Sequence, residues 1–420
     1  MKASRHTWLV GSTGVGKSSL LGNLIQQDIA AGHGVALIDP HGDLFEHVLS
    51  TLPARRAKDV VLIEPASNEC VPGINFLDVP EGPMRRLQVN FVVSEFLGMF
   101  NQLYDMRSAG GPMFELYFRN CVLLLMESRC PGATILDLAR VLNDKEFRSE
   151  LCAHCNDQQV VNFWKQTAER TSGDASLANF APYIVSKLNQ INQSGPIRPI
   201  VGQAHTTVDF RKLMDTRGIL LVNLSKGQLG EMDTRMLGMI LIGQLFSAAL
   251  GRASLPQDKR VAFHLYVDEF QNFVTDSISS LVAEARKFGL ELTLANQTLA
   301  QLTANKGHQN LLEAILGNVG NIITFRLGVP DAERLALFTE PELPREELQR
   351  LPNYHAFARL LTKEGPVDPF VFKSAPPAKA FPHAKRVLAK IRENQTQWSK
   401  PLEVVEREIA QRLNSSRWEK

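Results

Sequence analysis

The sequence predicts an α/β fold in which a mainly parallel, twisted sheet is interrupted by an inserted all-α domain. Three observations support this prediction. In residues 1–82, short apolar runs rich in β-branched side chains alternate with a helical pattern, which is typical of a parallel sheet. In residues 83–199 the strand pattern disappears and apolar residues recur at helical spacing. From residue 200 the strands return, so the insertion splits one α/β core into two segments.

The expected strands follow from the positions of the apolar runs. In the first segment, strands are expected at residues 7–10, 35–38, 60–63 and 74–77. In the second segment, residues 200–375, they are expected at residues 219–224, 263–267, 290–296, 322–325, 356–361 and 370–372. After two consecutive prolines, the rest of residues 376–420 is charged with a helical pattern, which predicts a helical C-terminal tail.

Composition limits the classes of protein to which this chain can belong. With 420 residues, 44% hydrophobic residues and 21% charged residues, it has the composition of a folded protein of two or three domains. The net charge of +2 gives no bulk attraction for nucleic acid, so any such contact would depend on a local basic cluster. Five cysteines without framework spacing favour free thiols in a reducing compartment.

Two further patterns concern metals and membranes. Cys152, His154 and Cys155 supply three possible metal ligands, but no second cysteine pair follows to complete a zinc site. The longest uncharged apolar stretch, residues 236–250, is shorter than the roughly 20 residues of a membrane-spanning helix, so we expect a buried helix there. No secretory signal is visible near the N-terminus, and a cytoplasmic location is therefore expected.

The strongest motif is residues 11–18, which match the phosphate-binding pattern G-x-x-x-x-G-K-[ST] at every fixed position. In such a loop, backbone N–H groups surround the β-phosphate, the lysine reaches the β- and γ-phosphates, and the following hydroxyl binds Mg²⁺. A buried strand precedes the loop and a helix follows it, as this site requires. The residues expected to bind ATP are Gly11, Ser12, Thr13, Gly14, Val15, Gly16, Lys17, Ser18, Ser19 and, from the next strand, Asp39.

The apolar strand at residues 263–267 ends in two adjacent carboxylates, Asp268 and Glu269. With a phosphate-binding loop in the same chain, Asp268 is expected to hold Mg²⁺ together with Ser18. Glu269 is expected to act as the general base for the attacking water, while Lys17 stabilises the transferred phosphoryl group. In isolation, an apolar run followed by two carboxylates is equally well interpreted as a strand with an ordinary acidic turn. The phosphate-binding loop in the same chain favours the catalytic interpretation.

Polar residues also follow other expected strands. Gln297 ends the strand at residues 290–296 and is expected to sense the γ-phosphate or orient water, the alternative being a capping amide. After the second strand, Asp39, His41 and Asp43 reach the same edge of the sheet. For the two aspartates, the alternative is that they stabilise the turn.

Arg286 lies near the end of an expected helix that closes at Gly289, a residue suited to a left-handed cap. From there it could complete the site of a neighbouring subunit as an arginine finger. The alternative is a solvated charge, because cations are favourable at helix C-termini.

Together these motifs resemble the type IV secretion coupling-protein family, within the FtsK/HerA superfamily of ring-shaped DNA-pumping ATPases. The resemblance rests on the loop at residues 11–18, on Gln297, and on residues 38–43, 222–227, 267–273, 284–289, 323–326 and 331–332. Their order and spacing fit residues 5–375. Only the phosphate-binding loop is specific by itself, whereas the complete set is specific jointly.

The resemblance implies a RecA-like ATPase motor that assembles as a hexamer, with ATP between subunits and Arg286 donated in trans. DNA would pass through a central channel, and hydrolysis would move DNA or a DNA–protein conjugate toward a secretion pore. Phe270, after the acidic pair, favours the coupling branch over the related secretion-assembly ATPases. Relaxase or other secretion components would be partners.

Coupling proteins usually carry an anchoring region before the motor, whereas here the first expected strand begins at Thr7. A location at the cytoplasmic face of the inner membrane would therefore require a missing or separate anchor. The alternative is a HerA-like pump that has no role at a membrane.

Candidate DNA contacts are Lys226, Arg235 and Lys306, for which solvated surface positions are an equally good interpretation. In a ring, each channel residue would be multiplied by the number of subunits. The leading hypothesis is an ATP-driven DNA translocase. The alternatives are a docking module for secretion substrates that nucleotide only orders, and a secretion ATPase that does not act on DNA.

Overall fold

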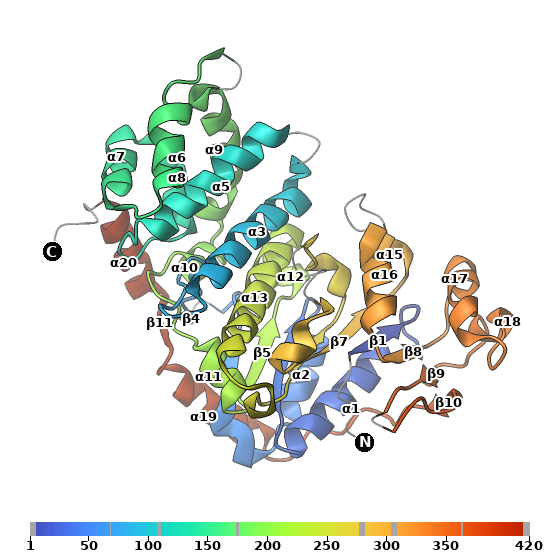
Figure 1. Ribbon diagram of the computed structural model, residues 1–420. Coiled ribbons are helices and arrows are strands. Elements are labelled where there is room, and N and C mark those ends of the chain that lie inside the picture. The colour runs from blue at the N-terminus through green and yellow to red at the C-terminus, as the bar shows by residue number, and fades with distance from the viewer. Residues whose placement is uncertain are drawn as a thin grey trace. The chain divides into compact units, whose positions relative to one another are not determined.

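The computed structural model describes residues 6–67, 69–106, 111–173, 176–276, 282–303, 309–362 and 364–414. The chain forms two compact units (Figure 1). The first unit contains the residues up to Glu64 together with Phe210–Gln228 and Leu255–Gln395, and the second contains Pro65–Asp209, Leu229–Ser254 and the residues from Thr396 onward.

The first unit is built around a nine-stranded sheet with the order β10-β9-β8-β1-β7-β6-β2-β5-β3. The strands are β1 (Thr7–Val10), β2 (Gly34–Asp39), β3 (Val60–Ile63), β5 (Ile219–Asn223), β6 (Phe263–Val267), β7 (Leu290–Asn296), β8 (Asn321–Thr324), β9 (His355–Arg359) and β10 (Phe370–Lys373). All pairs from β8 to β3 are parallel, and β9 and β10 extend the sheet through antiparallel pairs. The prediction of a mainly parallel α/β sheet is confirmed.

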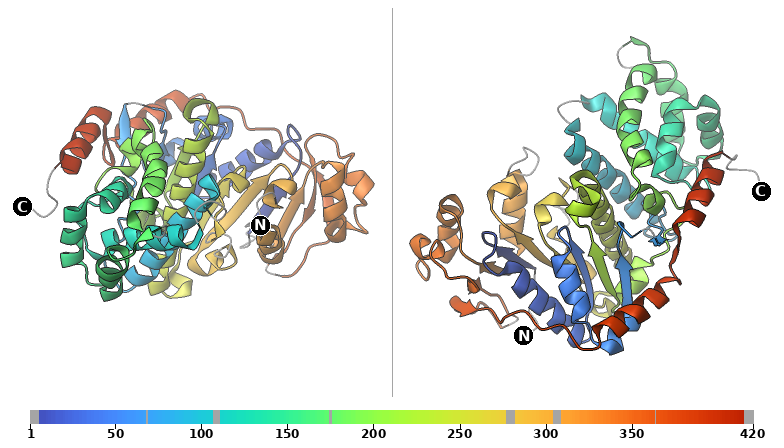
Figure 2. Two further views of the ribbon diagram at one scale, coloured as in Figure 1. Left: turned by 90° about the horizontal axis from the view of Figure 1, so that it is seen from above. Right: turned by 180° about the vertical axis from the view of Figure 1, so that it is seen from behind.

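Burial explains why these segments form strands. All six residues of β2 are buried, as expected for a parallel strand covered on both faces. The helices α1 (Lys17–Ala30) and α2 (Asp43–Ser50) contact β2, and α19 (Ala384–Gln395) contacts β3. Figure 2 shows these three helices on one face of the sheet. Shorter helices of this unit are α11 (Phe210–Asp215), α12 (Lys226–Leu229), α15 (Ala300–Thr303), α16 (Gln309–Asn318), α17 (Val329–Thr339) and α18 (Arg345–Leu348).

One expected strand, residues 74–77, is wrong. Ile74 is buried, but Asn75 forms hydrogen bonds to loop residues instead of pairing with a neighbouring strand. Its side-chain amide donates to the carbonyls of Ala133 (2.8 Å) and Ala204 (2.7 Å), and its backbone N–H donates to the Thr206 hydroxyl (3.0 Å). The strand lies just before it, as β4 (Cys70–Pro72), and pairs with β11 (Ser399–Pro401) in a separate small sheet.

The second unit is mainly helical, as predicted for the insertion. Its helices are α3 (Arg85–Tyr104), α5 (Gly111–Glu127), α6 (Leu138–Asn143), α7 (Lys145–His154), α8 (Gln158–Asn162), α9 (Leu177–Gln193), α10 (Arg198–Val201), α13 (Glu231–Gly251) and α20 (Leu402–Asn414). Aromatic rings join α3 to α5. The Phe118 ring lies 4.6 Å from that of Phe100 and 5.3 Å from that of Phe96, measured between centroids.

The contacts group the chain differently from the expected boundaries at residues 83–199, 200–375 and 376–420. The second unit begins at Pro65, ends its first segment at Asp209 and also contains α13 and α20. α13 packs along α3, where the Gln88 side chain donates to the Ser247 carbonyl at 2.9 Å. The expected tail divides between the units, because α19 contacts β3 whereas α20 contacts α10. Packing partners distant in sequence therefore set these boundaries.

The apolar stretch at residues 236–250 is buried, as predicted, but it belongs to a longer helix than expected. By length and composition alone, residues 231–254 could cross a bilayer, with a mean hydropathy of 1.5. However, 83% of the most apolar window is buried inside the structure. Core helices commonly have these properties, so α13 is weak support for a membrane span.

The five cysteines are free thiols. Burial raises the pKa of both Cys152 and Cys155, the latter to about 11. Within the described residues, no group of three or more His, Cys, Asp or Glu side chains is arranged to hold a metal ion.

Candidate functional site

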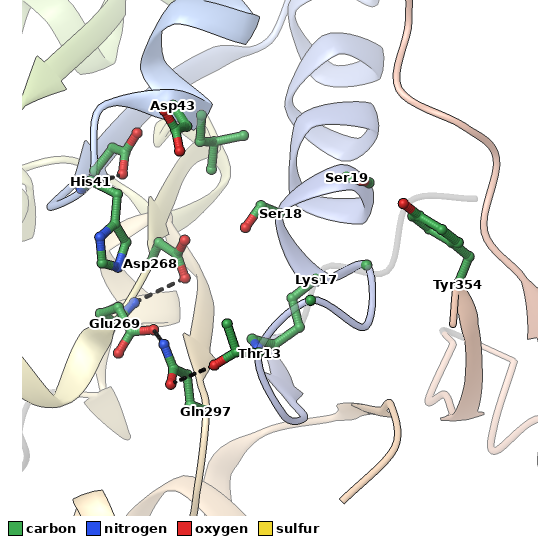
Figure 3. A pocket seen from close by; sticks show the side chains of 14 residues that line it. Thr13, Lys17, Ser18, Ser19, His41, Asp43, Asp268, Glu269, Gln297 and Tyr354 are labelled. Atoms are coloured by element: carbon green, nitrogen blue, oxygen red, sulfur yellow. Dashed lines mark hydrogen bonds between the residues drawn. The ribbon is translucent and has the colours of Figure 1, made fainter. Parts of the chain in front are cut away.

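Four neighbouring strands, in the order β1-β7-β6-β2, end at the same edge of the sheet. The register places Val10 opposite Asn296, and Ile38 opposite Val267. The residues that follow these strands line a pocket of about 370 Å³ (Figure 3). Its lining is Thr13, Gly14, Gly16, Lys17, Ser18, Ser19, Asp39, His41, Asp43, Leu44, Asp268, Glu269, Gln297 and Tyr354. The structure thus brings together most of the predicted site residues, which come from segments far apart in the sequence.

The loop after β1 depends on its glycines. Gly14 (φ 76°) and Gly16 (φ 113°) have left-handed backbone conformations that other residues rarely adopt. Gly11 leaves no room for a side chain, because a Cβ there would lie 2.6 Å from Cβ of Phe325. Gly11 and Val15 are buried inside the loop, and the Ser12 N–H donates to the Arg326 carbonyl at 2.9 Å. These three residues therefore shape the loop.

Helix α1 begins at Lys17, and no side chain caps its N-terminus. The first N–H groups of a helix lack partners within it, so an uncapped N-terminus at a pocket is suited to an anion. Ser18 is exposed and Ser19 is half-buried in this first turn. In Figure 3 the Ser18 hydroxyl points to the side of the pocket that carries Asp268.

Lys17 is only 7% exposed. Its ammonium group donates to the carbonyls of Gly11 (2.5 Å) and Ser12 (2.9 Å), which holds it inside the curve of the loop. Burial lowers the pKa of Lys17, and the carboxylates of Asp268 and Glu269 oppose this effect. A buried ammonium group beside an uncapped helix N-terminus fits a polyanion such as a nucleotide phosphate chain.

Asp268 lies at the end of β6, where its N–H donates to the Ile38 carbonyl at 3.2 Å. Its pKa is raised to about 6, mainly by burial and then by the carboxylates of Glu269 and Asp39. Lys17 acts in the opposite direction but does not cancel the effect. An excess of buried negative charge facing a serine hydroxyl fits a divalent cation, which prefers oxygen ligands.

Asp39 is fully buried. One of its carboxylate oxygens accepts the His41 N–H at 2.9 Å, and the other accepts the Phe45 N–H at 2.8 Å. Both oxygens thus stabilise the turn between β2 and α2. This is the alternative that the sequence left open, and a direct contact between Asp39 and nucleotide stays a prediction.

Glu269 has a left-handed backbone (φ 49°), which is uncommon for a residue with a side chain of this size. It is 6% exposed. Two side-chain amides hold its carboxylate: Gln297 Nε2 donates to Oε1 at 2.6 Å, and Gln271 Nε2 donates to Oε2 at 2.5 Å. These two hydrogen bonds give the general-base candidate a defined orientation.

The two amides continue into longer hydrogen-bond chains. The Thr13 hydroxyl donates to Gln297 Oε1 at 3.0 Å, which links the phosphate loop to Glu269 (Figure 3). On the other side, Asn296 donates to Gln271 Oε1, and Trp8 Nε1 donates to Asn296 Oδ1 at 3.1 Å. Sequence reasoning missed Gln271, Asn296 and Trp8. The available signal was a polar residue, Asn296, that ends a buried apolar strand.

The structure does not bring Arg286 to this pocket. It is exposed in a 3-10 turn, Ala285–Phe288, that Gly289 closes with the expected left-handed conformation (φ 74°). The turn precedes β7, whereas Gln297 follows it. A strand of seven residues places these ends about 20 Å apart, so within one chain Arg286 lies at the opposite edge of the sheet.

The candidate DNA contacts have different surroundings. Lys226 is partly exposed at the start of α12, and its N–H donates to the Pro40 carbonyl at 3.0 Å. Arg235, in the second unit, is half-buried, and its guanidinium donates to the Gln102 carbonyl at 3.5 Å. Burial lowers its pKa. Lys306 lies outside the described residues. Contact with DNA stays a prediction for all three.

Comparison with known proteins places this geometry in context. A family model described as the type IV secretion-system coupling protein DNA-binding domain matches residues 1–358. A search of curated proteins found no match. Among solved structures, the bacterial conjugative coupling protein TrwBdeltaN70 is similar, with 16% identity and a TM-score of 0.61 over 90% of this chain and 88% of that one.

Two further solved structures share the fold. TrwB in complex with ADP and Mg²⁺ has 17% identity and a TM-score of 0.61 over 90% of this chain and 88% of that one. VirB4 of Thermoanaerobacter pseudethanolicus has 15% identity and a TM-score of 0.61 over 89% of this chain and 90% of that one. At these identities the likeness shows the fold alone, a mainly parallel α/β sheet with a helical part.

Proposed function

Because this chain belongs to the type IV secretion-system coupling protein family, we propose that it is an ATP-driven DNA translocase of a conjugative or related secretion system. The observation that carries the proposal is the pocket in which Lys17, Asp268 and Glu269 meet at one edge of the sheet. The related TrwB binds ADP and Mg²⁺, and the pocket of this chain has the charges to hold the same kind of ligand.

Each of the pocket residues has a separate role in the proposed hydrolysis of ATP. Lys17 and the N–H groups at the start of α1 hold the phosphates, and Ser18 with Asp268 holds Mg²⁺. When bound, Mg²⁺ neutralises the charge on the phosphate oxygens. Glu269 orients a water molecule and accepts its proton as the water oxygen bonds to the γ-phosphorus and the bond to the leaving ADP oxygen breaks.

Gln297 links this chemistry to the state of the loop. Its amide donates to Glu269 and its carbonyl accepts from Thr13, so a γ-phosphate that attracts this amide would alter both contacts. We therefore assign it as the sensor of the γ-phosphate. Gln297 then determines whether one Glu269 oxygen is free to bind water.

Arg286 completes the site in trans in this proposal. Its exposure at the opposite edge of the sheet excludes direct action within its own pocket but allows action at that of a neighbour. A hexameric ring would provide that neighbour and a central DNA channel, with Lys226 as the best-placed basic contact. We place the protein in the cytoplasm, or at the cytoplasmic face of the inner membrane through a missing or separate anchor, with relaxase or other secretion components as partners.

The test is the ATPase rate with and without duplex and single-stranded DNA, measured for the wild type and for Lys226→Ala. DNA should stimulate the wild type, and the variant should show weaker stimulation with a shallower dependence on salt. Hydrolysis that is indifferent to both forms of DNA would refute translocation and favour a secretion ATPase without a DNA substrate.

A second measurement tests the shared site. Arg286→Ala and Lys17→Ala are expected to be inactive separately, and mixing them should restore part of the activity because some interfaces would contain both intact residues. An inactive mixture would overturn the role of Arg286 in trans while leaving the nucleotide site itself intact.

A further inference from the structure

One aromatic side chain enters the pocket from the side opposite to the carboxylates. Tyr354 lies in the connection before β9 and is 43% exposed. Figure 3 shows its ring beyond the phosphate loop from Asp268 and Glu269, next to Ser19. Neither the phosphate chemistry nor the metal site uses this residue.

The backbone of Tyr354 is fixed in a costly conformation. Its φ of 64° lies in the left-handed region, which is unfavourable for a bulky side chain. Its N–H donates to the Val15 carbonyl and its carbonyl accepts the Ser374 N–H, both at 2.7 Å. The phosphate loop itself therefore anchors this residue, and the strain places an aromatic ring where solvent reaches it.

The ring lies close to Gly16. A Cβ on Gly16 would lie 2.8 Å from Cδ1 of the Tyr354 ring and 3.3 Å from its Cα. Glycine is thus required at this position both for its own φ and for the approach of the ring. The ring covers the start of α1, beside the N–H groups that would hold phosphate.

The shape of the expected ligand connects these observations. In the proposed site, Lys17 and a metal ion on the carboxylates would hold the phosphate chain at one end of the pocket, so the nucleoside would extend toward the other end. Tyr354 is the aromatic residue that lines that end. An exposed aromatic ring offers a planar apolar surface, which suits a nucleobase.

We propose, resting on the function proposed above, that Tyr354 is the stacking platform for the base of the bound nucleotide. Recognition occurs through the face of the base and not through its hydrogen-bonding edge. Because every base has such a face, this contact adds affinity for nucleotides over inorganic phosphates and discriminates little between ATP and GTP.

The test compares ligands that share a triphosphate. Isothermal titration measures the Kd of a non-hydrolysable ATP analogue, the corresponding GTP analogue and inorganic tripolyphosphate, each with Mg²⁺. Two variants are used: Tyr354→Asn removes the ring with a residue that tolerates the left-handed region, and Tyr354→Phe keeps the ring. Tyr354→Asn should raise the Kd of both nucleotide analogues by about 10-fold to 100-fold and leave the Kd of tripolyphosphate unchanged. Tyr354→Phe should bind all three ligands as the wild type does.

Several outcomes would refute the proposal that Tyr354 stacks on the base of the nucleotide. If Asn weakens tripolyphosphate as much as the ATP analogue, Tyr354 only supports the loop. Unchanged nucleotide binding in that variant would remove its role altogether. Should the Asn variant not fold, wild-type protein with ribose 5-triphosphate, which lacks a base, still tests the idea, because equal affinity for this ligand and the ATP analogue refutes it. Failure of the wild type to bind any triphosphate would instead refute the nucleotide site.

Discussion

Two buried acidic sites, one in each unit, differ in how far their negative charge is compensated. In the first unit, Asp268 and Glu269 are buried at the pocket, and Lys17 does not compensate the pair fully, since the pKa of Asp268 stays raised to about 6. In the second unit, the fully buried Asp137 accepts a hydrogen bond from Arg412 at 3.0 Å.

The partners of Arg412 show how complete that compensation is. The same guanidinium donates to the Thr134 hydroxyl at 3.0 Å and to the Gly202 carbonyl at 2.8 Å. The Asp137 carboxylate is thus satisfied by groups of the chain itself, whereas Asp268 and Glu269 retain negative charge that a ligand can neutralise. In this comparison the uncompensated carboxylates lie in the candidate site, whereas the compensated one stabilises the fold.

The largest expected effect comes from the general base. Glu269→Gln keeps the size of the side chain but removes its basicity, so kcat should fall by about 100-fold to 10,000-fold while nucleotide binding persists. Steady-state ATPase assays and titration calorimetry measure the two quantities. Glu342→Gln, at an exposed position in the same unit, is the matched control and should be neutral. A variant of Glu269 that retains activity would assign the base elsewhere.

The second prediction concerns the contribution of the buried ion pair of Arg412 and Asp137 to stability. Arg412→Met keeps an apolar stem but removes the guanidinium that pairs with the buried Asp137, so the free energy of unfolding should fall by about 3 kcal/mol. Urea denaturation measures it. The exposed pair Lys400–Glu408 provides the control, because Lys400→Met should cost less than about 1 kcal/mol. Equal losses in the two variants would contradict the contrast between compensated and exposed charge.

The third prediction is a gain in the free energy of unfolding, whereas the second is a loss. The pKa of Asp268 is raised from 3.8 to about 6, so the folded state binds a proton more tightly than the unfolded state. Stability should therefore fall as pH rises from about 4 to 6 and stay low above that range. Asp268→Asn should stabilise the ligand-free protein at pH 7.5 by up to about 3 kcal/mol and abolish Mg²⁺-dependent nucleotide binding.

Thermal unfolding from pH 4 to pH 8 measures this difference. The gain from Asp268→Asn should shrink as the pH falls from 6 to 4, because the folded wild type binds a proton below about pH 6 whereas the unfolded chain does so only near its ordinary pKa of 3.8. A variant that is less stable than the wild type at pH 7.5 would show that the carboxylate is compensated after all, as in the second unit.

The smallest expected effect on kcat comes from Gln271, which orients the Glu269 carboxylate. Gln271→Met removes one of the two amides that hold Glu269 while keeping a similar volume. We expect kcat to fall about tenfold, which corresponds to one charge-assisted hydrogen bond, with the Kd for nucleotide unchanged. A weaker Kd with an unchanged kcat would show that Gln271 supports the pocket instead of the base.

Local patterns were sufficient to predict much of this protein. The phosphate-binding loop depends on glycines and a lysine within eight consecutive residues, so its conformation and charge are properties of that short segment. Asp268, Glu269 and Gln297 were found because each lies within two residues of the end of a buried apolar run. The expected strand at residues 74–77 failed because Asn75 bonds to Ala133 and Ala204, partners that no local pattern shows.

Only the tertiary structure decided how these segments combine. The order β1-β7-β6-β2 brings together residues more than 200 positions apart, and the chain from Trp8 to Gln271 exists only in that order. Tyr354 has no sequence signal, since its function follows from a hydrogen bond to Val15 and a close approach to Gly16. Periodicity and motifs report the local preference of the backbone and which side chains are buried. Strand order and hydrogen-bond partners depend on long-range packing, which the sequence specifies only through the complete fold.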